Sequence, residues 1–278
     1  MSNAQQKEYW NGEAGNNWAL GAETLDSMLH PFLALVLEAS GITSGDRVLD
    51  VGCGSGALSL AAIDAGARHV TGVDISAPML SVAHSRAQSQ PAPPEFLETD
   101  ASTWTAETPF DRVISRFGVM FFDDPVAAFS NLHRQTEPQG TLAFSCWQAA
   151  PLNEWAMAPM KAVLPLLSEP PTPPEPGAPG PFAFADPDRT RSILADAGWT
   201  KVSVTPWTGE MQLPGVGASE AAAFSFRFGP ISRLLAGNEN LDKLEFQARI
   251  EAELSKYEKP DGRVRLPGAA WIVTAKAS

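Results

Sequence analysis

Residues 48–59, VLDVGCGSGALS, constrain the fold of this chain more than any other segment. The largely apolar start predicts a buried strand, and Gly52, Gly54 and Gly56 then precede an apolar run that favours a helix. Glycine permits a tight turn and a close approach to the backbone that a Cβ would block. The following helix directs the free N–H groups at its N-terminus towards the turn. The segment therefore predicts a strand–turn–helix unit with a ligand crevice at the turn.

The same alternation of strands and helices continues along the chain. Strands are predicted at 46–51, 69–74, 95–100, 110–115, 141–147, 201–207 and 269–277, and helices between the first five at 57–67, 76–88 and 124–135. Such alternation requires right-handed crossovers and gives a mostly parallel sheet with helices on both faces. The predicted fold class is therefore α/β, a doubly wound, Rossmann-like sheet of seven strands with a helical cap or lid.

Three segments lie outside this alternation. Residues 24–41 have helical spacing, and we expect Pro31 to kink this helix or split it in two. Seven of the twelve residues in 170–181 are proline, which predicts an extended, semi-rigid segment. A well-marked helix follows at 186–199, and a second helical block is predicted at 218–228 and 240–258.

Charge and composition limit the partners. The formal net charge is −12 and the pI is about 4.8, so a basic face for phosphate backbones is not expected and no nucleic-acid partner is predicted. The apolar runs are too short to span a bilayer, and no secretory signal opens the chain. Two distant cysteines form neither a disulfide framework nor a metal-binding spacing. We therefore expect a cytoplasmic monomer or homodimer that acts on a small-molecule substrate.

Acidic residues stand at three predicted strand ends. Asp50 precedes the glycines, Asp74 ends the second strand at the distance expected for a ribose, and Asp100 ends the third. A carboxylate at Asp74 serves NAD and S-adenosyl-L-methionine (SAM) equally. An NAD-dependent oxidoreductase would need a proton donor such as a Tyr/Lys pair, but neither Tyr9 nor Tyr257 has a lysine four residues later. A non-catalytic SAM-binding module remains a second alternative.

Five motifs in order resemble the class I SAM-dependent methyltransferases, in a small-molecule branch similar to the ubiquinone/menaquinone-type enzymes. They are VLDVGCGSG, GVDISAPML, LETDAS, FDRVISRFGVMFFDDP and LHRQTEPQGTLAFSCW. One departure is Gln139, where the family usually has glycine; we expect it in a turn, without effect on chemistry. The resemblance implies an antiparallel last strand, with SAM as cofactor and S-adenosyl-L-homocysteine as product.

The resemblance also implies a cofactor site. The glycines approach the amino-acid portion of SAM, Asp74 holds the ribose, and Asp100 accepts from the adenine amino group. The whole implied set comprises Asp50, Gly52, Cys53, Gly54, Gly56, Asp74, Ile75, Met79, Asp100, Ala101, Ser115, Arg116 and Trp18. Within it, Ile75 and Met79 pack on the adenine, and Ser115 and Arg116 border the methionine end. Cys53 is interpreted as a small residue of the turn and not as a nucleophile, because the sequence places no histidine to activate it.

The substrate pocket is expected from aromatic residues near the carboxyl edge of the sheet, where exposed rings would line an apolar cavity. The candidates are Trp10, Phe117, Phe121, Trp147, Phe182 and Phe226. No general base is assigned, and no metal site is predicted. The predicted reaction is methyl transfer to an O, C or N atom of a small, largely apolar or aromatic acceptor.

These interpretations divide the chain into six parts. They are an N-terminal helical cap (1–45), a SAM-binding core (46–148), a proline-rich lid insertion (149–185), a core helix with the sixth strand (186–215), a helical lid insertion (216–262) and a final strand (263–278). The cap and both insertions are predicted to roof the substrate pocket together and exclude water from it.

Overall fold

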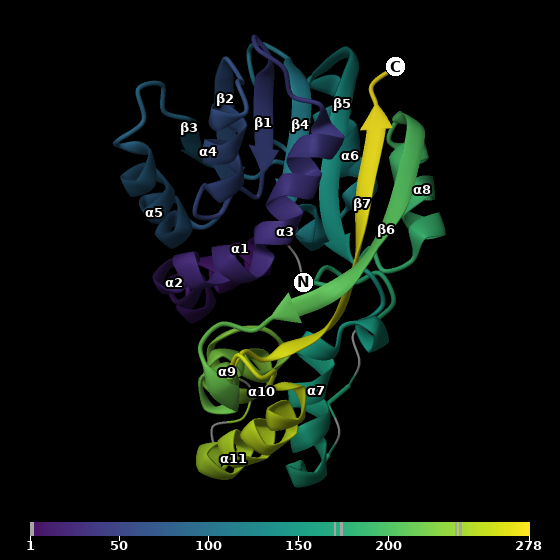
Figure 1. The fold of residues 1–278 in the computed structure, drawn as a ribbon. Helices are drawn as coiled ribbons and strands as arrows, with labels where there is room; N and C mark the ends of the chain where they lie inside the picture. Colours follow the sequence, from purple (N-terminus) through teal and green to yellow (C-terminus); the bar gives the residue numbers. More distant parts are fainter. Residues whose placement is uncertain (1–2, 170, 173–174, 237, 239–240) are drawn as a thin grey trace.

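A single seven-stranded sheet organises the computed structural model, which describes residues 3–169, 171–172, 175–236, 238 and 241–278. The strand order is β3-β2-β1-β4-β5-β7-β6 (Figure 1). The strands are β1 (Arg47–Val51), β2 (His69–Asp74), β3 (Glu95–Glu98), β4 (Phe110–Arg116), β5 (Thr136–Trp147), β6 (Thr200–Gln212) and β7 (Arg265–Lys276). β1 to β5 pair in parallel, and β7 runs antiparallel to both β5 and β6. The predicted fold class and antiparallel last strand are confirmed.

The strand registers explain why apolar runs mark the central strands. Val48 pairs with Val70 and with Arg112, and most residues of β1 and β2 are buried because helices cover both faces of the sheet. β5 and β6 are longer than predicted. Gln139 lies within β5 and not in a turn, with a left-handed φ of 63°. Pro206 lies in β6, where a residue without an N–H is tolerated because β6 is an edge strand.

Helices cover the sheet on both sides (Figure 1). α3 (Ala22–Ser40) crosses β4 and β5 and contacts α4 (Ala57–Asp64), α5 (Ala77–Ala87) packs against β3, and α6 (Pro125–Arg134) packs against α8 (Pro187–Asp196) on the far side. α3 is continuous through Pro31, so the expected split at this residue is wrong. The chain breaks instead at Gly21, the residue between α2 (Glu13–Leu20) and α3. The Asp186 carboxylate caps α8, as its sequence predicts.

A helical lobe lies below the carboxyl edge of the sheet (Figure 1). It consists of α7 (Glu154–Val163), α9 (Gly217–Arg227), α10 (Pro230–Ala236) and α11 (Lys243–Leu254). α11 packs against both α7 and α9. α10 was not predicted, because its seven residues follow the Gly229–Pro230 pair, which favours a turn.

The proline-rich segment is described in part. Pro170, Pro173 and Pro174 lie outside the described residues. In the described part, 171–172 and 175–186, the chain forms turns and extended backbone without helix or strand. The Gly180 N–H donates to the Met120 carbonyl at 3.0 Å, which ties the segment to the loop after β4.

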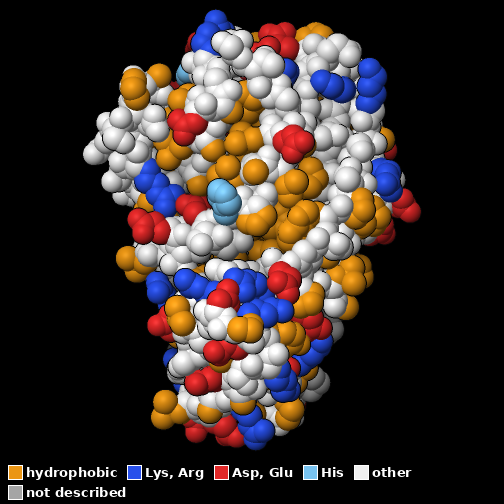
Figure 2. Space-filling view, viewed as in Figure 1, with side chains coloured by type: hydrophobic (Ala, Val, Ile, Leu, Met, Phe, Trp, Pro, Cys, Tyr) orange, Lys and Arg blue, Asp and Glu red, His pale blue; other side chains and the backbone are white. Residues whose placement is uncertain are grey.

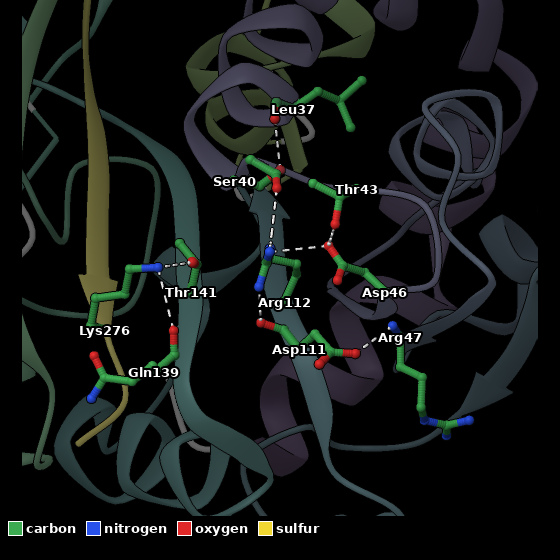
Figure 3. Close-up of polar contacts among 11 residues, drawn as sticks. Leu37, Ser40, Thr43, Asp46, Arg47, Asp111, Arg112, Gln139, Thr141 and Lys276 are labelled. Carbon is green, nitrogen blue, oxygen red and sulfur yellow. Dashed lines mark hydrogen bonds and ion pairs between the residues drawn. The ribbon is translucent and has the colours of Figure 1, made fainter.

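Polar contacts fasten the amino ends of the strands (Figure 3). Arg112 of β4 pairs with Asp46 at 3.2 Å and donates to the carbonyl of Gly41, which ends α3. Asp111 accepts from the Arg47 N–H at 2.8 Å and so joins β4 to β1. These contacts join β1, β4 and the end of α3 at this edge of the sheet.

No single helix in the described part of the chain is long and apolar enough to cross a membrane. α2 and α3 meet the criteria of length and composition only as a pair, which is bent by 78°.

Candidate functional site

The glycine turn between β1 and α4 forms the centre of the site. Gly52 and Gly54 adopt left-handed φ angles of 66° and 53°, which favour glycine. A Cβ on Gly52 would lie 2.7 Å from the Gly118 Cα, so the loops after β1 and β4 touch through their backbones. A Cβ on Gly54 would meet only the Met79 sulfur, at 3.6 Å, within 4 Å. The space beside Gly54 is therefore open, and close packing does not by itself explain why this position is a glycine.

Asp74 connects this turn to the loop after β2. Its Oδ2 accepts from the Gly54 N–H at 2.8 Å, and its Oδ1 accepts from the Ser76 N–H at 2.9 Å. Burial raises the pKa of the carboxyl, and these backbone hydrogen bonds oppose the rise. A carboxylate has about four lone-pair sites, so Asp74 retains acceptor capacity for a ligand.

Asp50 is a buried carboxyl with one oxygen unused. Its Oδ2 accepts from the Ser59 hydroxyl at 2.6 Å, whereas Oδ1 has no hydrogen-bond partner among the residues that the structure describes. Burial raises the pKa of Asp50 to about 7, although Ser59 and the positive charge of Arg116 favour the ionised form. An unpaired buried acceptor of this kind is suited to a cationic donor.

Three residues predicted to contact the cofactor already have protein partners. Asp100 Oδ1 accepts from the N–H and hydroxyl of Ser102 at 2.8 and 2.6 Å, and Oδ2 accepts from the Asn3 side chain at 2.9 Å. The Ala101 carbonyl accepts from the Asn131 amide at 3.0 Å. The Ser115 hydroxyl donates to the Val51 carbonyl at 2.7 Å, so it fastens β4 to β1.

The N-terminal helix α1 (Asn3–Asn11) lies across the carboxyl ends of the strands (Figure 1). Asn11 donates to the Ile75 carbonyl at 2.8 Å and accepts from the Ala77 N–H at 3.0 Å. The Ser76 hydroxyl donates to the Trp10 carbonyl at 2.7 Å. No local pattern in the sequence marks these contacts, because the bonded residues lie 64 to 66 positions apart.

Arg116 belongs to an ion-pair chain that the sequence also did not reveal. Asp26 of α3 pairs with Arg116 at 2.6 Å and with Arg86 at 2.7 Å, and Arg86 donates to the Ser55 carbonyl in the glycine turn at 3.1 Å. The second terminal nitrogen of Arg116, Nη1, has no partner in the described part of the molecule. Arg116 therefore presents an unused donor at the end of β4.

The remaining cofactor candidates surround the turn. Met79 is buried near Gly54, and Ile75 is half-buried in the loop after β2. Cys53 is buried, and this burial raises the pKa of its thiol, which disfavours the thiolate. Gly56 is packed against the ring of Phe96, which a Cβ would approach to 2.8 Å.

Four of the six aromatic candidates for the substrate pocket lie in two clusters of contacting rings. Phe117 follows β4 with a left-handed φ of 62°, and its ring stacks on Trp147 with centroids 4.2 Å apart. In the second group, the Trp10 ring contacts Phe121 and Trp18, and Trp18 contacts Phe228 of the helical lobe. Phe182 and Phe226 are half-buried against the main hydrophobic core. A left-handed aromatic residue at a strand end is unusual and favours a functional position.

Hydrophobic side chains gather on this face of the molecule (Figure 2). They lie over the sheet-bearing part, just above the waist where the helical lobe begins, whereas charged side chains are frequent over the lobe. No group of three or more His, Cys, Asp or Glu side chains able to hold a metal ion occurs among the described residues.

Comparison with known proteins identifies the core. Residues 48–140 match the family model of the methyltransferase domain. An uncharacterized protein of Mycobacterium tuberculosis is 38% identical over 133 residues, which cover 47% of this chain and 48% of that protein. The malonyl-[acyl-carrier protein] O-methyltransferase of Pseudescherichia vulneris is 36% identical over 121 residues, 43% of this chain and 46% of that enzyme. The chain thus spans about half the length of the curated relatives it matches.

Solved structures agree on the fold. The YcgJ protein of Bacillus subtilis aligns with a TM-score of 0.59 at 16% identity, over 89% of this chain and 98% of that one. Phosphoethanolamine N-methyltransferase 2 of Haemonchus contortus, in complex with phosphomonomethylethanolamine and S-adenosylhomocysteine, aligns with a TM-score of 0.53 at 18% identity, over 88% and 52%. The fold is that of the class I SAM-dependent methyltransferases. Residues 48–140 are the part of the chain that matches the methyltransferase-domain model.

Proposed function

We propose that this protein is a SAM-dependent methyltransferase that acts on a small, largely apolar or aromatic acceptor at an O, C or N atom. The observation that carries the proposal is the open glycine turn beside Asp50 and Asp74, within a matched methyltransferase domain. The turn lies at the carboxyl ends of the strands, where open α/β sheets bind their ligands.

The residues present fit SAM. The unpaired Oδ1 of Asp50 suits the ammonium group of its methionine portion, and the open side of Gly54 permits close approach. Asp74 has lone pairs left for ribose hydroxyls. Asp100 would take the adenine amino group, with Met79 packed against the ring. Of the other proposed contacts, Ile75 and Trp18 would cover the adenosine, Ala101 would use its backbone, and Ser115 and Arg116 would border the methionine end.

When bound, SAM supplies an electrophilic methyl group on a sulfonium sulfur. The chain's own residues therefore mainly orient the reactants and exclude water. The apolar surface above the waist supports this acceptor class, because it favours an apolar or aromatic molecule. The stacked rings of Phe117 and Trp147 are buried in the main hydrophobic core, so they do not by themselves mark a pocket. The two named enzymes among the comparisons act on chemically different acceptors, so their names do not decide the acceptor of this chain.

Three segments would roof this pocket, and each contacts the loop after β4 or a neighbour of that loop. Trp10 of α1 touches Phe121, and Gly180 of the proline-rich segment donates to Met120. The helical lobe reaches α1 through Arg233, whose guanidinium lies 5.2 Å from the Tyr9 ring centroid. These contacts support a roof built jointly by the N-terminal helices, the proline-rich segment and the lobe.

The proposed setting is the cytoplasm, as a monomer or homodimer without a nucleic-acid partner. A net charge of −12 supports the exclusion of nucleic acid, and two buried free cysteines are compatible with a reducing compartment.

Calorimetry with S-adenosylhomocysteine and a radiolabelled-methyl transfer assay test the proposal. We expect the wild-type protein to bind the nucleoside, and Asp74→Ala to weaken binding by on the order of 2–3 kcal/mol, because charged hydrogen bonds are lost. Asp64→Ala, at an exposed position of α4, is the matched control and should bind as the wild type does. Binding of NAD without binding of SAM would refute the proposal.

A further inference from the structure

Gln6 combines burial with an unpaired polar side chain in the described part of the protein. Its side chain is 2% exposed, and neither its amide nitrogen nor its amide oxygen has a partner among the described residues. An unsatisfied buried amide costs free energy in the folded protein. A ligand that supplies both a donor and an acceptor would remove that cost.

The position of Gln6 on α1 indicates which ligand this is. Asn3, Gln6 and Trp10 are spaced along one face of the helix, with rises of about 4.5 and 6 Å between them. Asn3 is bonded to Asp100 at the end of β3, and the Trp10 carbonyl is bonded to Ser76 just after β2. Gln6 therefore lies between the strand end proposed for the adenine and the strand end proposed for the ribose.

We infer that the Gln6 side chain recognises the adenine ring of the bound nucleoside through a bidentate amide–adenine pair. This inference rests on the proposed function. The Gln6 carbonyl oxygen accepts from the adenine amino group, and its NH₂ group donates to the ring nitrogen N7, as glutamine does with adenine in nucleic acids. α1 thus contributes a base-specific contact from outside residues 48–140, in addition to the contact proposed for Asp100.

The closing experiment measures two properties of Gln6→Met, which keeps the volume but removes both polar groups. S-adenosylhomocysteine should bind about tenfold more weakly, because two hydrogen bonds are lost. The unfolding midpoint without nucleoside should stay or rise, because a buried unpaired amide is removed. Glu8→Met, on the exposed face of the same helix, is the control and should bind as the wild type does.

A second arm uses S-inosylhomocysteine, which has a carbonyl in place of the adenine amino group. The wild type should prefer S-adenosylhomocysteine over this analogue, because the Gln6 amide pairs with adenine but not with the carbonyl of the analogue. The preference should shrink about tenfold in Gln6→Met, because methionine makes neither hydrogen bond. If Gln6→Met does not fold, Gln6→Asn, whose amide is one methylene shorter, should show the same losses. Wild-type affinity or an unchanged preference in the variant that folds overturns this inference alone. Failure of the wild type to bind the nucleoside overturns the proposed function as well.

Discussion

Asp50 and Asp74 share a chemical type but differ in what their surroundings leave unpaired. Asp74 receives backbone N–H groups on both oxygens, so its ionised form is supported inside the fold. Asp50 receives one hydroxyl and keeps a bare oxygen, and burial raises its pKa to about 7. The first residue is therefore structural as well as a candidate ligand contact, whereas the second is costly to the fold when it is ionised.

This cost makes stability depend on pH. The raised pKa lets the folded protein hold the Asp50 proton up to about pH 7, whereas the unfolded chain releases it near the ordinary pKa of 3.8. Asp50 therefore leaves the free energy of unfolding unchanged below about pH 4. As the pH rises from there to about 7, Asp50 lowers the free energy of unfolding progressively. The loss is on the order of 4 kcal/mol, at 1.36 kcal/mol per pH unit.

Urea denaturation at pH 5 and pH 7.5 checks the dependence. We expect Asp50→Asn, which cannot ionise, to remove most of the fall in stability between the two values. Asp64→Asn, at an exposed position, should leave that fall as it is in the wild type. Equal pH slopes in Asp50→Asn and wild type would contradict the buried, proton-retaining role of Asp50.

Among the elements, the glycine turn allows an effect on stability to be distinguished from an effect on ligand binding. Gly41 and Gly54 have similar left-handed φ angles, 61° and 53°, and a Cβ on Gly41 would meet nothing within 4 Å. We expect Gly41→Ala and Gly54→Ala each to cost about 1–2 kcal/mol of stability, as the left-handed backbone predicts. Only Gly54→Ala should also weaken S-adenosylhomocysteine binding. Equal binding by both variants, measured by calorimetry, would show that no ligand approaches Gly54.

The attachment of α1 to the loop after β2 depends on Asn11, the last residue of the helix. Asn11→Ala removes both hydrogen bonds to the loop after β2, so amide hydrogen exchange in α1 should accelerate by a factor equivalent to about 1–3 kcal/mol. Asn16→Ala is the control, because the Asn16 side chain donates to the Gly12 carbonyl four residues away and so does not join α1 to the sheet. Unchanged exchange in Asn11→Ala would mean that the aromatic contacts of Trp10 are sufficient to hold α1.

Elements with local signals could be predicted from the sequence. The glycine turn and the cap of α8 are examples, because each is decided by residues a few positions apart. Gln6 and Asn11 have no such signal, since burial and bonding partners come from strands far along the chain. The extension of β6 beyond residue 207 was missed for a similar reason: its polar residues face solvent at an edge and pair only with β7.

At the scale of the whole molecule, the helical lobe shares one hydrophobic core with the sheet and also contacts the N-terminal helices α1 and α2. Trp18 touches Phe228 with ring centroids 6.2 Å apart, and Arg233 donates to the Tyr9 hydroxyl at 3.3 Å. A roof that opens for substrate and closes over it would have to break and remake these contacts between the lobe and the N-terminal helices.

Phe226 tests this roof. We expect Phe226→Ala to raise the substrate KM or lower turnover about tenfold, because a half-buried ring of the lobe is lost, while cofactor affinity stays nearly intact. Leu244→Ala, at an exposed position on α11 of the same lobe, should leave both parameters unchanged. Unaltered kinetics together with a changed oligomeric state in Phe226→Ala would assign the lobe to subunit contact instead.

The antiparallel strand β7 lies between β5 and β6, although it follows both along the chain. During translation, β6 and the entire lobe therefore leave the ribosome before the strand that attaches them to the sheet. Until residues 265–276 emerge, the hydrogen-bonding edge of β5, from Thr141 to Trp147, stays unpaired. Exposed strand edges are sites of intermolecular pairing, so nascent or truncated chains that stop before β7 should be the species that most need a chaperone.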